Sequence, residues 1–222
     1  MKSLNELFDK TESTWKILNE WVENAKNHVE LLPVNSKENQ KILLELQITT
    51  KSLLGTVVYY TGGILVNDGW LRILGSGDSR LPRNLATWNQ IENGQSMRLP
   101  GSLLVADDVV GGFFAINGGA FEGNIGDVFY LAPDTLEWEN LDMSYSDFVN
   151  WALTGDVSRF YETFQWENWS DMVRKATGDK GILIYPYLWA EGEEIELRSK
   201  SIVPVNELWE LNLDNRKKLG LE

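Results

Sequence analysis

GGILVNDGWLRILG, residues 62–75, holds two short apolar runs separated by a turn. The runs span residues 64–66 and 70–74, and the turn contains Asn67, Asp68 and Gly69, which tolerate positive φ. Two such runs around such a turn predict a β-hairpin. Three further strands are predicted on the same grounds, at 113–116, 128–131 and 136–141.

Other segments show weaker strand patterns. Leu44, Leu46 and Ile48 alternate with polar residues, which predicts a half-buried strand. An apolar strand is expected over 181–188, with 195–197 as its partner. Residues 53–60 fit a strand or a helix, because they are rich in β-branched and aromatic residues yet end at two glycines.

Helices are expected at both ends of the chain. Apolar residues at spacings of three and four predict an amphipathic helix over 13–29. A short helix should follow Ser144, its N-cap, with Asp147 three residues later and Gly155 past its end. Two more are expected at 169–176 and 207–213. Strands in the middle with helices at both ends favour an α+β fold, a mostly antiparallel sheet flanked by helices.

The composition is that of one globular domain over 1–222. No apolar run approaches 18 residues, and the first ten residues mix charged with apolar side chains, so we expect neither a membrane span nor a signal peptide. Cysteine is absent and His28 is the single histidine, so we expect no metal and no cofactor. These properties favour a soluble, cytoplasmic protein.

Charge is distributed unevenly along the chain. Residues 99–158 contain ten acidic residues and no Lys or Arg, although the whole chain has a net charge of −13. Such a segment attracts a cationic partner and repels phosphate. Nucleic acid is therefore excluded as a direct ligand, because its binding depends on Lys and Arg.

Asp107 and Asp108 are the most tempting catalytic pair. Adjacent residues on a strand point to opposite faces, so the two carboxylates would converge only at a turn. We therefore favour a solvated or partner-contact role for them. Glu137 and Glu139 flank Trp138, and on a strand they should share the solvent face while Leu136 and Trp138 face the core.

The segment 121–127 offers oxygen ligands on a glycine-rich loop. A calcium site there is conceivable, but it lacks the EF-hand spacing. We therefore assign its acids, with those above, to a partner-binding surface. The predicted partner-binding residues are Asp107, Asp108, Glu122, Asp127, Glu137 and Glu139.

Three stretches carry a family resemblance: residues 54–66, residues 69–77 and the segment from Asn206 onward. Together they resemble a bacterial family catalogued as a domain of unknown function, numbered twenty-six twenty-five. The Gly62-Gly63 pair and the strand, turn and helix between 128 and 151 are similar, more distantly, to the SUKH superfamily of immunity-type proteins. This similarity implies a SUKH-like core over about 40–156, an N-terminal helical segment over 1–33 and a C-terminal extension over 157–222.

The resemblance implies a domain that binds other proteins and has no catalytic residues to carry over. The leading hypothesis is therefore a non-enzymatic, immunity-type protein that binds a basic protein through its acidic surface. The alternative is a carboxylate-based hydrolase or a carbohydrate-binding protein, which could use Trp166 and Trp169 to stack on a sugar. The sequence does not indicate an oligomeric state.

Overall fold

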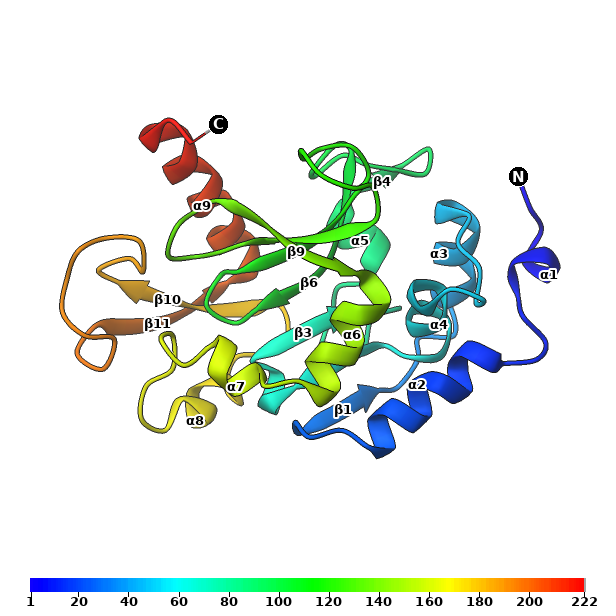
Figure 1. Ribbon diagram of the computed structural model, residues 1–222, viewed down its shortest axis with the longest axis horizontal. Helices are drawn as coiled ribbons and strands as arrows, with labels where there is room; N and C mark the ends of the chain where they lie inside the picture. The colour runs from blue at the N-terminus through cyan, green and yellow to red at the C-terminus, as the bar shows by residue number, and fades with distance from the viewer. Residues whose placement is uncertain (222) are drawn as a thin grey trace.

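The predicted hairpin forms the second and third strands of a seven-stranded antiparallel sheet in the computed structural model, which describes residues 1–221 (Figure 1). Its strands are β2 (Gly63–Val66) and β3 (Leu71–Leu74), and the short helical turn η1 (Asn67–Gly69) joins them. The sheet order is β1-β2-β3-β6-β7-β8-β9. The other strands are β1 (Val29–Leu32), β6 (Ser102–Asp108), β7 (Phe113–Asn117), β8 (Asp127–Leu131) and β9 (Trp138–Ser144).

Helices and small sheets cover this central sheet, which confirms the α+β class. The helices are α1 (Leu4–Leu7), α2 (Ser13–Glu23), α3 (Asn39–Leu46), α4 (Leu53–Tyr60), α5 (Leu85–Asn89), α6 (Tyr145–Thr154), α7 (Val157–Phe160), α8 (Trp169–Val173) and α9 (Val205–Leu219). Two short hairpins complete the described part: β4 (Ile91–Glu92) with β5 (Gln95–Ser96), and β10 (Lys180–Tyr185) with β11 (Ser199–Pro204). No helix among residues 1–221 is long and apolar enough to cross a membrane.

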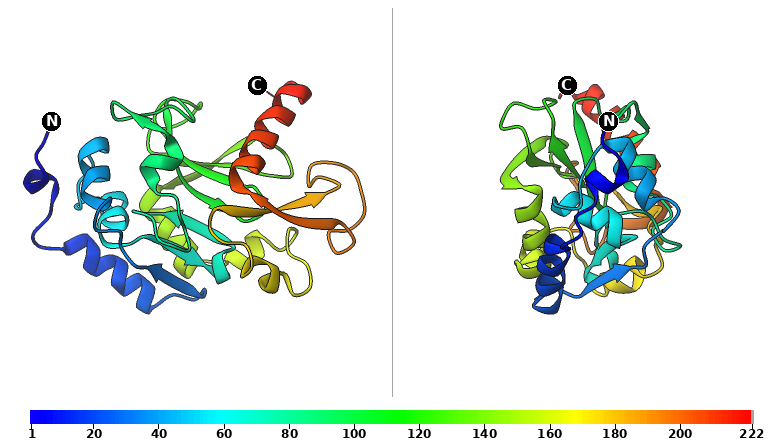
Figure 2. Two further views of the ribbon diagram at one scale, coloured as in Figure 1. Left: turned by 180° about the vertical axis from the view of Figure 1, so that it is seen from behind. Right: turned by 90° about the vertical axis from the view of Figure 1, so that its right-hand side faces the viewer.

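The two ends of the chain occupy opposite ends of the molecule. Helices α1 to α4 gather at one end, and β10, β11 and α9 lie at the other, with the sheet between them (Figures 1 and 2). The C-terminal segment is hydrogen-bonded to the rest: Ile182 N donates to Val109 O at 2.6 Å, and Gly178 N donates to Arg80 O at 2.7 Å. All four residues of β3 are buried, because covering elements lie on both faces of the sheet.

Helix α6 was anticipated from its termini. Ser144 accepts a hydrogen bond from Asp147 N, and the Asp147 carboxylate accepts from Ser144 N and Oγ, which forms the capping box. Gly155 is the C-cap, as predicted. Phe148 and Val149 point inward and are fully buried.

Three secondary-structure predictions were wrong. The strand expected from Leu44, Leu46 and Ile48 is occupied by helix α3, in which Ile42 and Leu43 face the core while Leu44 is 36% exposed. The helix expected over 13–29 is α2, which ends at Glu23, and Val29 starts β1. The partner of β10 is β11, whereas residues 195–197 lie in the connecting loop.

That loop is organised by side chains. Arg198 donates hydrogen bonds to the carbonyl groups of Pro186, Tyr187, Ala190 and Glu193, and Lys200 donates to three carbonyls nearby. Several carbonyl groups of residues 186–198 thus have side-chain partners instead of strand partners, so the apolar alternation over 195–197 did not indicate a strand.

Candidate functional site

Asp107 lies directly opposite Arg72 in the ladder between β6 and β3. Residues opposite each other in an antiparallel pair place their side chains on the same face of the sheet. The Asp107 carboxylate accepts a hydrogen bond from Arg72 Nε at 2.7 Å and also forms an ion pair with Arg72 Nη2. The hairpin at residues 62–75 therefore provides the first cation of a buried cluster.

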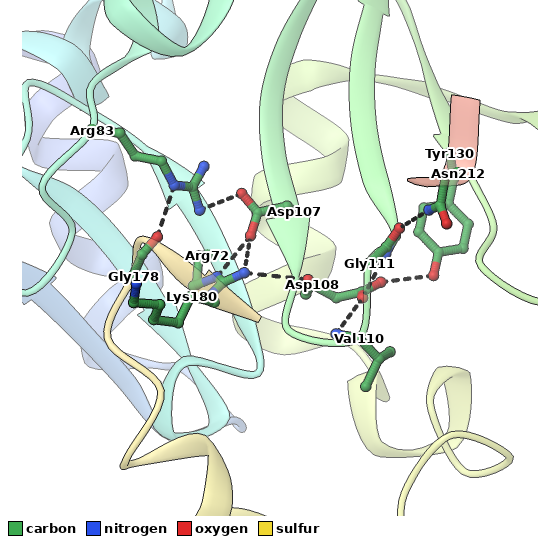
Figure 3. A network of polar contacts seen from close by, with 11 residues as sticks. Arg72, Arg83, Asp107, Asp108, Val110, Gly111, Tyr130, Gly178, Lys180 and Asn212 are labelled. Atoms are coloured by element: carbon green, nitrogen blue, oxygen red, sulfur yellow. Dashed lines mark hydrogen bonds and ion pairs between the residues drawn. The ribbon is translucent and has the colours of Figure 1, made fainter. Parts of the chain in front are cut away.

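Arg83 provides the second cation. Its Nη2 lies 2.5 Å from Asp107 Oδ2, so one carboxylate is paired with two guanidinium groups (Figure 3). Asp107 is 0% exposed, Arg72 1% and Arg83 8%, so the three charges are buried together. Burial lowers the pKa of Arg83 to about 10, so its guanidinium remains charged at neutral pH.

One further donor of each arginine binds the C-terminal segment. Arg72 Nη1 donates to Lys180 O, and Arg83 Nε donates to Gly178 O at 2.7 Å (Figure 3). Arg83 also lies over the indole of Trp88, with its Cζ 4.7 Å from the ring centroid. The cluster thus joins β3, β6 and α5 to the strand β10.

Asp108 points away from this cluster and has its own set of donors. Its Oδ1 accepts hydrogen bonds from Val110 N at 3.0 Å and Gly112 N at 2.8 Å, and its Oδ2 accepts one from Tyr130 Oη at 2.7 Å (Figure 3). The side chain is 0% exposed, and this burial raises its pKa to about 6. A side chain at Gly112 would collide with the Asp108 carboxylate and with Tyr130.

The partner-binding assignment of Asp107 and Asp108 was therefore wrong. Both carboxylates are fully buried, so neither is accessible to a partner surface. They also point to opposite faces of β6, as expected for neighbours on a strand, so they do not converge on one substrate bond. Their contacts assign them to holding the sheet, the β6–β7 turn and the C-terminal segment together.

The other predicted partner-binding residues lie along the last strand of the sheet and beside it. Glu137 and Glu139 are exposed, whereas Leu136 is fully buried and Trp138 is half-buried, as predicted. The strand itself begins only at Trp138, because Leu136, with a φ of 57°, lies in the turn before β9. Glu122 is exposed on the loop before β8, and that loop contacts β9 through Phe121 and Trp138, whose ring centroids are 4.7 Å apart. β9 ends the sheet order, so its outer edge carries no neighbouring strand of that sheet.

Asp127 differs from these exposed acids because it is half-buried. The side-chain amides of Asn124 and Asn140 donate hydrogen bonds to its Oδ2 at 3.0 and 3.3 Å. In this arrangement Asn124 presents its NH2 group to Asp127 rather than its oxygen. Among residues 1–221 no group of three or more His, Asp or Glu side chains is placed to hold a metal ion.

The exposed carboxylates of the acidic segment have no ion-pair partner among residues 1–221. The exposed acids are Glu122, Asp134, Glu137, Glu139, Asp142, Asp147 and Asp156.

Three other residues considered in the sequence have structural contacts. Trp166 and Trp169 pack on the fully buried Trp70, with centroid distances of 6.0 and 5.0 Å, so they hold the tail against the core. His28 lies just before β1, with Nδ1 3.4 Å from Asp68 Oδ1.

Sequence reasoning missed Arg72, Arg83 and Tyr130 as partners of the two aspartates. One signal was available: Arg72 interrupts an apolar strand, and Asp107 and Asp108 end the apolar run 103–106. A charge within an apolar strand predicts a buried counter-charge. Nothing in the sequence pairs Arg83 with them, because it lies outside any regular pattern.

The fold and its polar groups define an α+β protein whose sheet is joined to the C-terminal segment by a buried arginine–aspartate cluster. Its edge strand β9 is acidic, and the exposed carboxylates there form no ion pairs among residues 1–221. The chain belongs to the family described as "Protein of unknown function DUF2625", whose model matches residues 4–208. It is 43% identical over 211 residues to the uncharacterised protein YbfG of Escherichia coli K12, with 95% of each chain covered. It is also 39% identical over 223 residues to an uncharacterised Haemophilus influenzae protein, covering 100% of this chain and 98% of that one.

Proposed function

We propose that this protein is a binding protein that docks a basic protein partner on the β9 acidic surface. We define this surface as the acids around the edge strand β9. Glu137, Glu139 and Asp142 are exposed along it, and the exposed Glu122 and half-buried Asp127 lie on the side of Trp138 and Asn140, the face opposite Glu139. The observation that carries the proposal is that no cation among residues 1–221 forms an ion pair with these acids, which lie in a segment of sixty residues without Lys or Arg. A basic partner would supply the missing counter-charges.

The geometry of β9 favours contact through side chains over addition of a strand. The register of the β8–β9 ladder shifts between Asp127 and Phe129, and Asp142 has a φ of 52°. Bulges and charged side chains at a sheet edge disfavour pairing with another strand. The partner would therefore meet carboxylates rather than open backbone groups.

The proposed mechanism is occlusion of the partner's own functional surface. The negative field would raise the encounter rate by about 10- to 10³-fold at low salt. An immunity-type role, in which the partner is a toxin domain in the cytoplasm, is the form of this function that the SUKH-like pattern of the sequence supports. Apolar side chains beside the acids would then determine the dissociation rate.

Capture from a lysate of the source bacterium tests this proposal. Wild-type protein and the Glu137→Lys/Glu139→Lys variant are immobilised at equal density, and captured proteins are quantified by mass spectrometry. The matched control is Glu20→Lys/Glu23→Lys, which makes the same charge change at exposed acids of helix α2. We expect a basic protein that the wild type and the control retain and the β9 variant loses. Equal retention by all three, or no captured basic protein, would contradict the proposal.

A further inference from the structure

A cleft beside the start of β6 and the end of β7 has a lining without charged side chains. It lies between the end of α3, the β4–β5 hairpin and the beginning of β6, and its volume is about 560 Å³. Its apolar lining comes from Leu46, Ile48, Met97, Pro100, Leu103 and Ile116, and the rest consists of glycines, serines and Gln95. Four separate segments of the chain therefore converge on it.

No lining residue carries a charge, although 24% of the chain is charged. Two other cavities, of about 520 and 250 Å³, are lined by charged side chains, including Arg83 with Lys37 in one and Arg80 with Arg174 in the other. A charged ligand would be desolvated in the uncharged cleft with no counter-ion to offset the cost. The lining chemistry therefore selects a neutral occupant.

The apolar side chains of this cleft are not sealed by the protein itself. Leu46, Ile48, Leu103 and Ile116 are half-buried, and Met97 is 51% exposed. Apolar atoms left accessible in a concave site gain free energy when a ligand covers them. Met97 has a flexible thioether side chain that can adapt to the shape of such a ligand.

Polar groups in the cleft are few, as in small-molecule sites. The Gln95 side chain is exposed in the β4–β5 hairpin, and Gly94 and Gly101 have φ values of 77° and 76°. Gly94 leaves the peptide groups of its turn without a covering side chain, whereas the Gly101 carbonyl already accepts from Gly118 N and Ala120 N. A volume of this size lies within the range of ligand pockets, roughly 300–1,000 Å³.

We propose that this cleft binds a small, neutral, mostly apolar molecule, independently of the β9 acidic surface. The cleft offers no carboxylate to a basic protein, so the electrostatic attraction proposed for β9 does not extend to it. Its occupant would cover Met97 and orient itself through one or two hydrogen bonds to the Gln95 side chain or to the turn backbone.

A matched pair of fluorescent probes tests the inference. N-phenyl-1-naphthylamine is neutral, and 8-anilinonaphthalene-1-sulfonate adds a sulfonate to the same rings. Both are titrated in high salt, which screens the net charge of the protein. We expect saturable binding of the neutral probe and binding of the sulfonate that is roughly tenfold weaker or more. Absence of saturable binding by the neutral probe, or tighter binding of the sulfonate, would overturn the proposal.

Methionine methyl resonances locate the probe. The chain has four methionines, Met1, Met97, Met143 and Met172, and only Met97 lines the cleft. The neutral probe should shift the Met97 methyl signal and leave the other three in place. The substitution Met97→Lys should weaken binding about tenfold or more, whereas Ile125→Lys, at an apolar side chain that is 72% exposed elsewhere, should not. An unchanged Met97 signal at saturation, or equal affinity in both variants, would also overturn it.

Discussion

Asp107 neutralises two buried guanidinium groups with a single carboxylate, and this imbalance makes it the most sensitive residue of the cluster. Taking charges out of water is costly, and only close pairing offsets the cost. Without the carboxylate, Arg72 and Arg83 would face each other as buried like charges. The folded state therefore requires the Asp107 carboxylate, because it offsets the cost of burying the two guanidinium groups.

Replacing Asp107 with Asn should therefore destabilise the protein by about 3–5 kcal/mol, because it leaves buried positive charge uncompensated. Urea denaturation at neutral pH measures the change. The control Asp134→Asn removes an exposed acid of the same segment and should alter the free energy of unfolding by no more than about 0.5 kcal/mol. Equal midpoints for the two variants would show that the ion cluster does not support the fold.

Asp108 should make stability depend on pH in the opposite sense to a salt-bridged acid. Burial raises its pKa from 3.8 to about 6, so the folded state holds this proton more tightly than the unfolded chain. The contribution of Asp108 is most favourable below pH 3.8 and is lost as the pH rises to about 6. The full change corresponds to about 3 kcal/mol.

The variant Asp108→Asn tests this directly, because its amide oxygen can still accept from Val110 N and Gly112 N. The free energy of unfolding is measured for both proteins at several values between pH 3.8 and 7. We expect the difference, wild type minus variant, to fall by about 3 kcal/mol across that window. Parallel pH profiles would mean that Asp108 does not titrate there.

At the scale of single elements, helix α6 connects the acidic strand β9 to the core through its N-terminus. Ser144 ends β9 and caps α6, so the capping box fixes the direction in which the chain leaves the sheet. Phe148 then packs on Phe114 of β7, with a centroid distance of 4.8 Å. The orientation of β9 thus depends on a local signal that the sequence contains.

Replacing Ser144 with Ala should lower the free energy of unfolding by about 1 kcal/mol, because it removes the cap. Ser146→Ala is the matched control, since Ser146 is exposed in the first turn of the same helix. Thermal unfolding of both variants measures the difference. A loss of stability equal in both would show that the cap contributes nothing beyond a general effect of serine removal.

Local signals of this kind explain which parts of the fold the sequence predicts. The 62–75 hairpin, strands β7 and β8 and helix α6 follow from turns, caps and periodicity within a dozen residues. Helix α3 did not, because the same residues satisfy a period of 2 and a period of 3.6 over so short a span, and the core on one side of it selected the helix. The pairing of β10 with β11 depends on Arg198 and Lys200, which no periodicity describes.

In the candidate site, too, the sequence predicted the features that depend on neighbouring residues and missed those that depend on residues distant in sequence. The alternation around Trp138 placed Glu137 and Glu139 on the exposed face correctly, because it depends on neighbours in sequence. The burial of Asp107 and Asp108 depends on Arg72, Arg83 and Tyr130. These partners lie on other segments of the chain, 22 to 36 residues away in sequence. A count of acidic residues cannot separate buried from exposed carboxylates.

At the scale of the whole molecule, the C-terminal segment completes the buried cluster. Both arginines donate to its carbonyl groups, and Asn212 Nδ2 of α9 donates to Gly111 O at 2.8 Å beside Asp108 (Figure 3). Trp166 and Trp169 cover Trp70 of the 62–75 hairpin. Removal of this segment would expose the apolar hairpin and leave guanidinium donors unpaired.

A chain truncated to residues 1–155 should therefore lack a cooperative unfolding transition, whereas a chain of residues 1–220, which keeps α9, should retain one. Circular dichroism during heating measures both. A cooperative transition of the 1–155 chain near the midpoint of the full protein would show that residues 156–222 are an appendage rather than part of the core.

The central functional proposal concerns the whole field of the molecule, so its most direct measurement is an association rate. The rate constant for the captured basic partner is measured at increasing ionic strength for the wild type and for Glu137→Lys/Glu139→Lys. Screening weakens attraction between charges, so we expect the wild-type rate to fall steeply with salt and the variant to start lower and depend on salt less. A wild-type association rate that is indifferent to ionic strength would contradict docking on the β9 acidic surface.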